Sequence, residues 1–234
     1  MSFWGNFMNT VRRALFPQAA AEREFGVSPA VSMTMEKYIA LWYAMMVNTP
    51  PWQDCNVKAV GLPAAICREV ARPTLVEFTA NITGSKRADY LNDGFQLAKE
   101  NFGRALELGL ALGGVALKPY IYGDKLLVDM TGAAGFQPTK FDQTGRCVGG
   151  VFRDKPVKVN GKYYVRLESH DLTGTTYTIK NKAYYSDSTG SVGAAAPLDV
   201  VPEWADIQEE VTIQNMDGPL FAYFKPPIAN TADT

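Results

Sequence analysis

The sequence predicts an α+β fold, with helices in the first part of the chain and antiparallel strands in the second. Apolar residues recur at helical spacing as far as residue 112, and from residue 115 onward short aromatic and β-branched runs alternate with two-residue turn signals. Because the two patterns occupy separate stretches, we expect a mainly helical region over 1–112 and an antiparallel β region over 113–226. We expect 227–234 to be a disordered or truncated tail.

The first sixteen residues carry an amphipathic pattern. Phe3, Trp4, Phe7, Met8, Val11, Leu15 and Phe16 recur at near-helical spacing beside Arg12 and Arg13. A signal peptide places its charge before the apolar stretch, whereas here the arginines follow it. The pattern predicts a helix that packs on a neighbour or on another subunit, with a helix on a membrane surface as the alternative.

Three further helices are predicted. The first starts at Ser28 and Pro29, and Asn48 to Pro51 stop it. The second starts at Leu62, carries Ile66, Val70, Leu75 and Phe78, and has a kink or break at Pro73. The third is capped by Ser85 and ends at Gly113 and Gly114. Its stripe consists of Leu91, Phe95, Ala98, Phe102, Ala105, Leu106 and Gly109.

Turn signals divide the second part into hairpins. Gly123-Asp124, Asp142 to Gly145 and Asn160-Gly161 each separate two strand-like runs, and Asn-Gly suits a type I′ turn. Strands are further expected at 175–180, 182–185, 211–214 and 220–224. Ser186 to Ala196 is rich in Ser, Gly and Ala, which predicts an exposed, flexible loop.

Composition limits the function classes. The chain has 234 residues, of which 47% are apolar and 20% charged, so it can bury a core. With 23 Lys and Arg against 24 Asp and Glu, no basic excess attracts it to nucleic acid. No apolar run is long enough to span a bilayer, so we expect no membrane partner.

Motifs for chemistry are not found. The sequence has no P-loop and no GxGxxG spacing, so neither ATP-driven chemistry nor a cofactor is expected. Cys55, Cys67 and Cys147 are an odd count without a CxxC spacing, which predicts buried, reduced thiols rather than disulfides or a zinc site. No spacing typical of metal ligands occurs, and we expect no metal.

One histidine remains as a candidate for chemistry. His170 lies in Ser169-His170-Asp171, whose adjacent side chains cannot converge on one reacting atom. We interpret it as a loop histidine at a strand end. A hydrolase that pairs Cys147 or Cys67 with His170 is the least favoured alternative.

Tyrosines are frequent in the predicted strands. Such residues suit half-buried pleated surfaces, but they also form glycan-stacking or subunit interfaces. The residues are Tyr120, Tyr122, Tyr163, Tyr164, Tyr177, Tyr184 and Tyr185.

Six stretches, taken together, resemble a portal-protein family of tailed bacteriophages, found in siphophages of Gram-positive hosts. The stretches are Phe25 to Ala30, Gly61 to Glu69, Asn81 to Asn92, Glu107 to Gly114, Lys118 to Tyr120 and Pro219 to Pro227. Their order and spacing match the family over most of the chain. Two features depart from it: Pro73 interrupts a helix that is continuous in relatives, and the Ser186 to Ala196 loop has no counterpart.

The resemblance implies a structural subunit of the portal ring, the head-tail connector through which viral DNA is packaged and ejected, and no enzymatic activity. The implied partners are further copies in a ring expected to be a dodecamer, the terminase, capsid, scaffold and tail-connector proteins, and double-stranded DNA held non-specifically in the channel. The implied location is the virion, and the host cytoplasm during assembly. Relatives continue after the equivalent of Lys225-Pro226-Pro227, so the chain corresponds to an N-terminal wing-like part without stem or clip. A ligand- or glycan-binding module of the virion or cell surface is the alternative.

Overall fold

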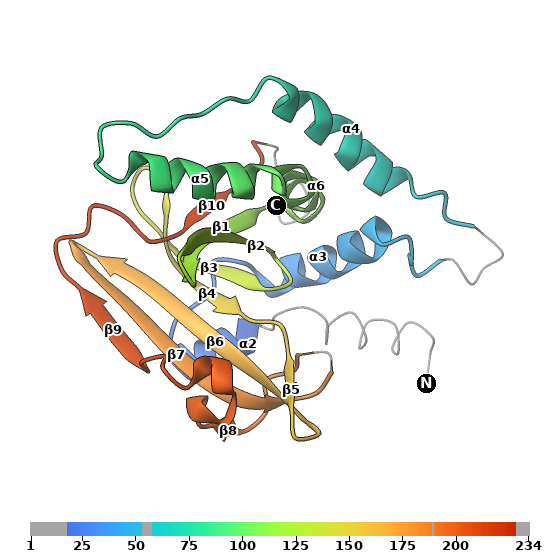
Figure 1. Ribbon diagram of the computed structural model, residues 1–234. Helices are drawn as coiled ribbons and strands as arrows, with labels where there is room; N and C mark the ends of the chain where they lie inside the picture. Colours follow the sequence, from blue (N-terminus) through green and yellow to red (C-terminus); the bar gives the residue numbers. More distant parts are fainter. Residues whose placement is uncertain (1–17, 53–57, 189, 228–234) are drawn as a thin grey trace. The chain divides into compact units, whose positions relative to one another are not determined.

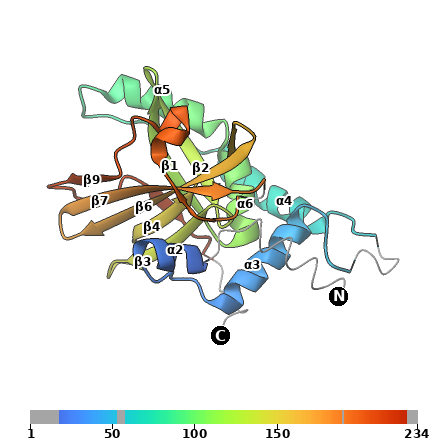
Figure 2. The same ribbon diagram turned by 90° about the horizontal axis from the view of Figure 1, so that it is seen from below.

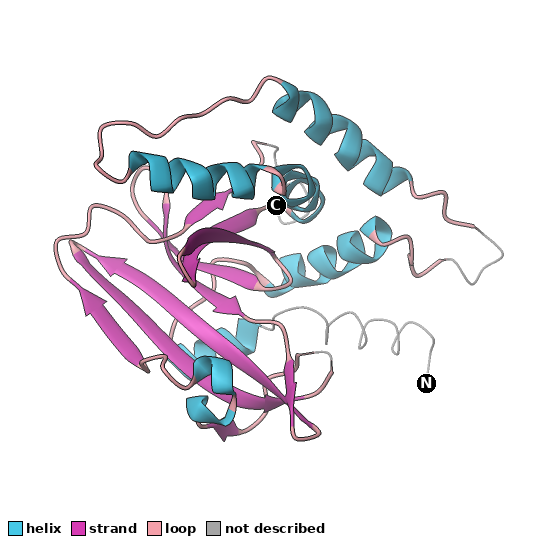
Figure 3. Ribbon diagram, viewed as in Figure 1, coloured by secondary structure: helices cyan, strands magenta, loops and turns pink. Residues whose placement is uncertain are grey.

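The computed structural model describes residues 18–52, 58–188 and 190–227. The predicted helix at the N-terminus and nearly all of the predicted tail lie outside these residues. Helices precede strands along the chain, and every strand pairing is antiparallel (Figure 3), so the α+β class is confirmed.

Helices fill the first part of the described chain. They are α2 (Gln18–Phe25), α3 (Met33–Met46), α4 (Leu62–Val76), α5 (Ala88–Lys99) and α6 (Phe102–Leu112) (Figure 1). Two short 3-10 helices, η1 (Leu198–Val200) and η2 (Pro202–Trp204), lie within the β part.

The strands form two sheets. The first has the order β10-β1-β2, from Ala222–Phe224, Val115–Tyr122 and Lys125–Gly132. The second has the order β3-β4-β6-β7-β8, with β5 paired to β6 and β9 paired to β7. Its strands are β3 (Phe136–Phe141), β4 (Cys147–Arg153), β5 (Val157–Val159), β6 (Lys162–Thr173), β7 (Thr176–Ser186), β8 (Ala195–Ala196) and β9 (Glu210–Ile213).

The chain divides into two compact units that are interleaved in sequence. The β unit comprises 1–40 and 133–219 with 231–234, and the helical unit comprises 41–132 with 220–230. The predicted boundary at 112 therefore separates helices from strands but does not separate the compact units. The reason is packing: Gly94 of α5 lies against Leu126 of β2, and Gly109 of α6 lies against Val115 of β1. The first hairpin thus belongs with the helices.

The helices differ from prediction in three places. The α3 helix starts four residues later than Pro29, and the hydroxyl of Ser32 accepts a bond from the Met35 N–H at 3.0 Å. The α4 helix runs through Pro73 to Val76, so the expected break is absent. Pro73 has no N–H to donate to the carbonyl four residues back, but α4 continues for only three residues beyond it.

The predicted third helix is two helices. Figure 1 shows α6 end-on beside α5, and Asn101 between them leaves the helix ladder by bonding its N–H to the Ala98 carbonyl at 3.0 Å. The turn places Phe95 and Phe102 together, with ring centroids 5.7 Å apart. Phe78 packs on both rings. Aromatic packing at this corner thus stabilises a bend that helical periodicity alone does not reveal.

The predicted hairpin turns are confirmed. Tyr122 pairs with Lys125 across Gly123-Asp124, and Val159 pairs with Lys162 across Asn160-Gly161. Asn160 and Gly161 have φ of 49° and 80°, as a type I′ turn requires. By contrast, the two strands predicted at 175–180 and 182–185 are one long strand, β7.

The core of the β unit lies on both faces of its sheet. On one face α2 covers the strands (Figure 2), and Ala20 and Ala21 pack against Val151, Val165 and Leu167. On the other face the η1 and η2 segment packs on the sheet through Leu198, Val201 and Trp204. Because both faces are covered, strands β4 and β6 bury runs of consecutive residues rather than alternate ones.

The described part of the segment predicted as an exposed, flexible loop contacts the β unit, and its last two residues form β8 (Ala195–Ala196). Arg153 donates to the Gly190 carbonyl at 2.9 Å and to the Ala134 carbonyl at 2.7 Å. Burial lowers the pKa of Arg153 to about 10, against the opposing charge of Asp187. Val192 packs on the core of the β unit. The loop is therefore held to the sheet at two points.

Candidate functional site

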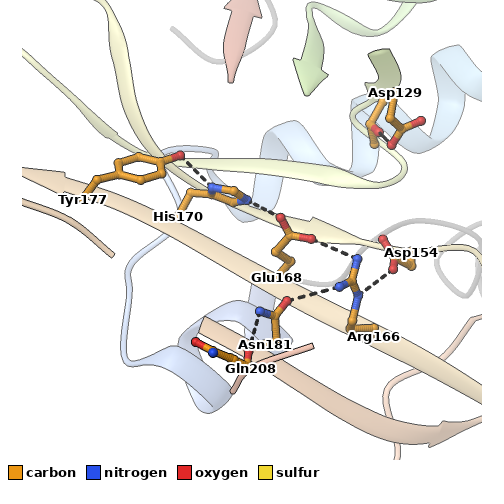
Figure 4. Close-up of polar contacts among 9 residues, drawn as sticks. Asp129, Asp154, Arg166, Glu168, His170, Tyr177, Asn181 and Gln208 are labelled. Atoms are coloured by element: carbon orange, nitrogen blue, oxygen red, sulfur yellow. Dashed lines mark hydrogen bonds and ion pairs between the residues drawn. The ribbon is translucent and has the colours of Figure 1, made fainter. Parts of the chain in front are cut away.

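Three charged or titratable side chains follow one another on a single face of β6. Arg166, Glu168 and His170 are spaced by two residues, and alternate residues of a strand share a face. Figure 4 shows them in a row along the strand. The row lies in the β unit and is the densest polar cluster described there.

Short contacts connect this row at its histidine end. His170 Nε2 lies 2.6 Å from Glu168 Oε1, and His170 Nδ1 lies 2.6 Å from the hydroxyl of Tyr177 on β7. With Glu168 ionised, Nε2–H donates to the carboxylate and Nδ1 accepts from the phenol. A phenol, an imidazole and a carboxylate in this order match the arrangement of nucleophilic catalysis, in which a base contacts a hydroxyl group and a third group orients the base.

The arginine end of the row carries two carboxylates. Arg166 Nη2 lies 3.0 Å from Glu168 and Nε donates to Asp154 at 2.8 Å. Arg166 also donates to Asn181 Oδ1 at 3.4 Å, and Asn181 in turn donates to the Gln208 carbonyl at 2.9 Å. One guanidinium therefore fixes β6, the β4–β5 connection and the segment before β9.

The burial of this row determines whether its side chains can contact a substrate. His170 is 2% exposed and Tyr177 is 0% exposed. Phe152 packs edge-on against the imidazole at 5.2 Å between ring centroids, and Phe136 packs on Phe152 at 4.6 Å. The phenol oxygen thus lies inside the unit, where a hydroxyl cannot reach a substrate. The arrangement orders a core, because buried polar groups that satisfy one another fix a unique packing.

The interpretation of His170 as a loop residue at a strand end is wrong. The residue lies inside β6, which runs to Thr173, and it pairs with Gly150 on β4. The neighbours Ser169 and Asp171 point to the opposite face, so the three adjacent side chains do not converge. Sequence reasoning missed Glu168 and Tyr177, although the period-two spacing of Arg166, Glu168 and His170 was a usable signal.

The described cysteines are poor nucleophiles. Cys147 is buried and donates to the Gly149 carbonyl at 3.2 Å, and burial raises its pKa to about 11. It lies on the opposite face of β4 from Gly150, the residue that pairs with His170. Burial and then the charge of Glu107 raise the pKa of Cys67. Cys55 lies outside the described residues.

Within 18–52, 58–188 and 190–227, no group of three or more His, Cys, Asp or Glu residues is arranged to hold a metal ion. In the same residues no helix is both long and apolar enough to cross a membrane.

The exposed apolar side chains form the second candidate site, and they are unevenly distributed. Among the described residues, all large exposed ones except Tyr38, Phe141 and Tyr185 belong to the helical unit. They include a row on α4, where Leu62, Ile66 and Val70 are 57%, 54% and 48% exposed. These residues were predicted to lie on α4, but the buried face of α4 is formed instead around Ala71.

The tyrosines do not form one platform. Tyr164, Tyr177 and Tyr184 are buried in the β unit, whereas Tyr120 and Tyr122 are exposed on the first hairpin of the helical unit. The buried ones serve packing, since Tyr164 contributes to the core below η1 and η2. The exposed tips of Tyr120 and Tyr122 suit an interface with a wet rim.

The structure thus defines an α+β protein with two compact units, a buried polar cluster in the β unit and exposed large apolar side chains concentrated in the helical unit. No protein-family model matches the chain, and a search of curated proteins finds no match.

Proposed function

We propose that the chain is the wing-like N-terminal part of a phage portal subunit, which acts through its surfaces rather than through a reaction. The observation that carries the proposal is the concentration of exposed large apolar side chains on the helical unit. Contiguous apolar surface on a protein marks sites where other proteins bind. A ring subunit needs two such surfaces, because each copy contacts a neighbour on either side.

The stretches that resemble the portal family support this proposal by their positions. Four of the six fall wholly in the helical unit, and a fifth does so from Leu220 onward. Several coincide with helix ends, where residues are constrained by backbone conformation. Gly61 and Gly113 flank α4 and α6 with φ of 67° and 87°. Asn92 of α5 holds both backbone groups of Ile82 at 2.8 Å. The resemblance thus follows the unit with the exposed surface.

Electron microscopy tests this function directly. Gold-labelled antibodies against the chain should mark a single vertex of phage particles, next to the tail. Labelling of every vertex, of tail fibres or of the cell surface would contradict the portal assignment. Binding on a glycan array together with surface labelling would favour the alternative, a glycan-binding module.

Solution size gives a second test. We expect the chain by itself to be monomeric or weakly associated, because the channel helices of relatives supply much of the ring interface. Light scattering after size-exclusion chromatography measures this mass. A stable dodecamer would contradict the expectation that channel helices outside this chain supply much of the ring interface.

A further inference from the structure

Two strands of the β unit have an outer edge that no described strand covers. Among the described residues, β9 pairs only with β7 and β5 pairs only with β6, and β6 and β7 lie between them (Figure 1). The two outer edges therefore lie on opposite sides of the same sheet, about 14 Å apart or more at the usual spacing of neighbouring strands. An uncovered edge presents N–H and C=O groups to which another strand can bind.

The outer edge of β9 presents the backbone groups of Glu210 and Thr212. The N–H of Asn181 on β7 donates to the Glu209 carbonyl at 2.8 Å, and hydrogen-bonded pairs alternate with non-bonded pairs along an antiparallel ladder. The register places Val211 in the next bonded pair, so the residues on either side of it direct their N–H and C=O groups away from β7. Both of these residues have exposed side chains.

The outer edge of β5 presents the backbone groups of Lys158. Val159 and Lys162 flank the two-residue turn Asn160-Gly161, and the pair next to such a turn is hydrogen-bonded. The preceding residue, Lys158, therefore directs its N–H and C=O groups away from β6. Its ammonium group lies 5.4 Å from the ring centre of Tyr163, and the side chain is exposed.

The two edges carry opposite charges. The hairpin of β5 and β6 is basic, and no acidic residue interrupts its sequence from 155 to 166. Its exposed lysines are Lys155, Lys158 and Lys162. The segment around β9 is acidic, and the sequence from 183 to 224 contains no lysine or arginine. Its exposed carboxylates next to the strand are Asp206, Glu209 and Glu210. Like charges disfavour the pairing of either edge with a copy of itself, whereas opposite charges favour the pairing of one edge with the other.

Few of these charges are paired within one copy. In the part of the chain that the structure describes, none of the three lysines forms an ion pair, and of the three carboxylates Glu210 alone does, with Lys180 at 3.6 Å on the surface. The exposed Asp199 and Glu203 lie on η1 and η2, which pack under β5, and they form no described ion pair with the hairpin either. The two carboxylates that flank the hairpin lie beside arginines, Asp154 beside Arg166 and Asp187 beside Arg153.

We propose that the outer edge of β9 binds β5 of a second copy as an additional antiparallel strand. With Lys158 of the second copy opposite Thr212, the outward backbone groups of the two strands face one another, and the lysine lies diagonal to Glu210. The same register forms β-branched pairs across the strands. The pairs are Val157 with Ile213 and Val159 with Val211. Because these four side chains lie on one face of the sheet, that face continues from copy to copy.

The strand directions fit a head-to-tail assembly. Strands β5, β6, β7 and β9 alternate in direction, so β5 of the second copy, antiparallel to β9 of the first, runs in the same direction as β5 of the first. Copies joined in this way share one orientation, and each uses two different surfaces. Contacts of this heterologous kind can close into a ring, and in this respect the inference rests on the proposed function. Because the paired strands are short, we expect the contact by itself to be weak.

Disulfide trapping in the full chain tests the register. Lys158→Cys and Thr212→Cys are combined in a chain that also carries Cys55→Ser and Cys67→Ser. In the proposed pairing the two new thiols lie opposite each other with about 5.5 Å between Cα atoms, within the reach of a disulfide. Because each copy has one thiol of each kind, oxidation should give a ladder of dimers, trimers and longer species on a non-reducing gel. Either substitution without the other should give dimers at most.

A mismatched pair of thiols is the control for chance collisions. Lys158→Cys with Asp217→Cys has equally exposed positions, but residue 217 lies outside β9. We expect about tenfold less product beyond the dimer from this variant, because no contact raises the effective concentration of its thiols. Circular dichroism verifies that both variants fold.

Charge exchange tests the choice of partner. Lys158→Glu places a like charge near Glu210 of the next copy, and Glu210→Lys does the same in the opposite sense. Either variant should weaken association by about fivefold in sedimentation equilibrium. An equal mixture of the two variants, or both substitutions in one chain, should restore association to within about twofold of the wild type, because opposite charges again face one another. Lys58→Glu changes the net charge equally at an exposed position of the helical unit and should leave association unchanged.

Three results would overturn the proposal: no disulfide ladder beyond the dimer, an equal ladder from the mismatched pair, or charge exchange that does not restore association. These results are separate from those of the vertex labelling. A labelled vertex without a ladder would remove this contact and leave the portal assignment, whereas a ladder without a labelled vertex would leave the contact and remove the portal assignment.

Discussion

The β unit and the helical unit use their large apolar residues in opposite ways. The β unit buries large side chains, among them Tyr177, Tyr184, Phe152 and Leu167, none of which is more than 2% exposed. In the helical unit, most of the buried apolar residues are alanines. These are Ala44, Ala71, Ala98, Ala105 and Ala116. Alanine lets helices approach closely but removes little apolar area from water. Among the described residues, the helical unit therefore leaves more of its large apolar side chains exposed, and the β unit buries more of them.

Replacement of a charged residue should give the largest difference between the two units in the loss of unfolding free energy. Arg166→Leu leaves Glu168 and Asp154 without the cation they share, and removing one member of a buried charge pair costs about 3–5 kcal/mol. In the helical unit, Arg68→Leu breaks an exposed pair with Glu107 and should cost less than about 1 kcal/mol. Hydrogen exchange of β6 and β7 amides, and of α4 amides, measures the two local unfolding free energies. Equal losses would mean that the buried row contributes no more than a surface ion pair.

Truncation of an apolar side chain tests the same difference between the two units without changing a charge. Leu167→Ala opens a cavity in the β unit and should cost about 2–5 kcal/mol. Ile66→Ala removes an exposed side chain from α4 and should change stability by less than about 0.5 kcal/mol. Urea unfolding monitored by circular dichroism gives both values. A large loss for Ile66→Ala would mean that its outer face is covered within a single copy.

Glycine substitutions show where the helical unit is tightly packed. A Cβ at Gly94 would lie 2.9 Å from the Leu126 carbonyl oxygen and 2.8 Å from its Cβ, so α5 and β2 would have to separate. Gly94→Ala should cost about 1–3 kcal/mol, even though alanine favours a helix over glycine by about 1 kcal/mol. Gly132→Ala meets only the Leu108 side chain, with Cδ2 at 2.7 Å, which can rotate away. We expect its thermal midpoint to fall less than that of Gly94→Ala, and the reverse order would contradict this packing.

Acidification should affect the β unit through Glu24 of α2. Burial raises the pKa of this carboxyl, but the hydrogen bonds from Tyr184 and Arg23, together with the charges of Arg23 and Lys182, outweigh burial and lower the pKa from 4.5. A group whose folded pKa is depressed stabilises the fold above its unfolded pKa and loses this contribution as the pH falls through the folded value. Glu24→Gln should therefore be less stable than the wild type at neutral pH, and the difference should shrink below about pH 4. Thermal midpoints between pH 3 and 7 measure the difference, and a constant difference would contradict the linkage.

The hairpin turns of the fold were readable from the sequence, because their signals are local. Asn160-Gly161 specifies a hairpin whatever surrounds it, and so does the Gly123-Asp124 turn. The bend at Asn101 was not readable, because it depends on Phe78 packing against Phe95 and Phe102 from another segment. The assignment of the first hairpin to the helical unit likewise depends on a contact between segments distant in sequence, that of Gly94 on α5 with Leu126 on β2.

The candidate sites were less predictable than the fold. The partners of His170 come from its own strand and from β7, and only the register of that hairpin places Tyr177 beside the imidazole. The exposed face of α4 was missed for a different reason. Helical periodicity identifies an apolar row but does not state which row faces inward when a helix has two, and here Ala71 rather than Ile66 and Val70 faces α6.

The interleaving of the two units constrains how the chain folds as it is synthesised. The β unit needs α2 from the beginning of the chain and strands that end near residue 213, and the helical unit needs β10 at Ala222–Phe224 to complete its sheet. The helical unit therefore cannot complete its sheet until the strands of the β unit have been made, although domains normally fold one after another from the N-terminus. The helices of that unit therefore remain without their last strand while the strands of the β unit are synthesised.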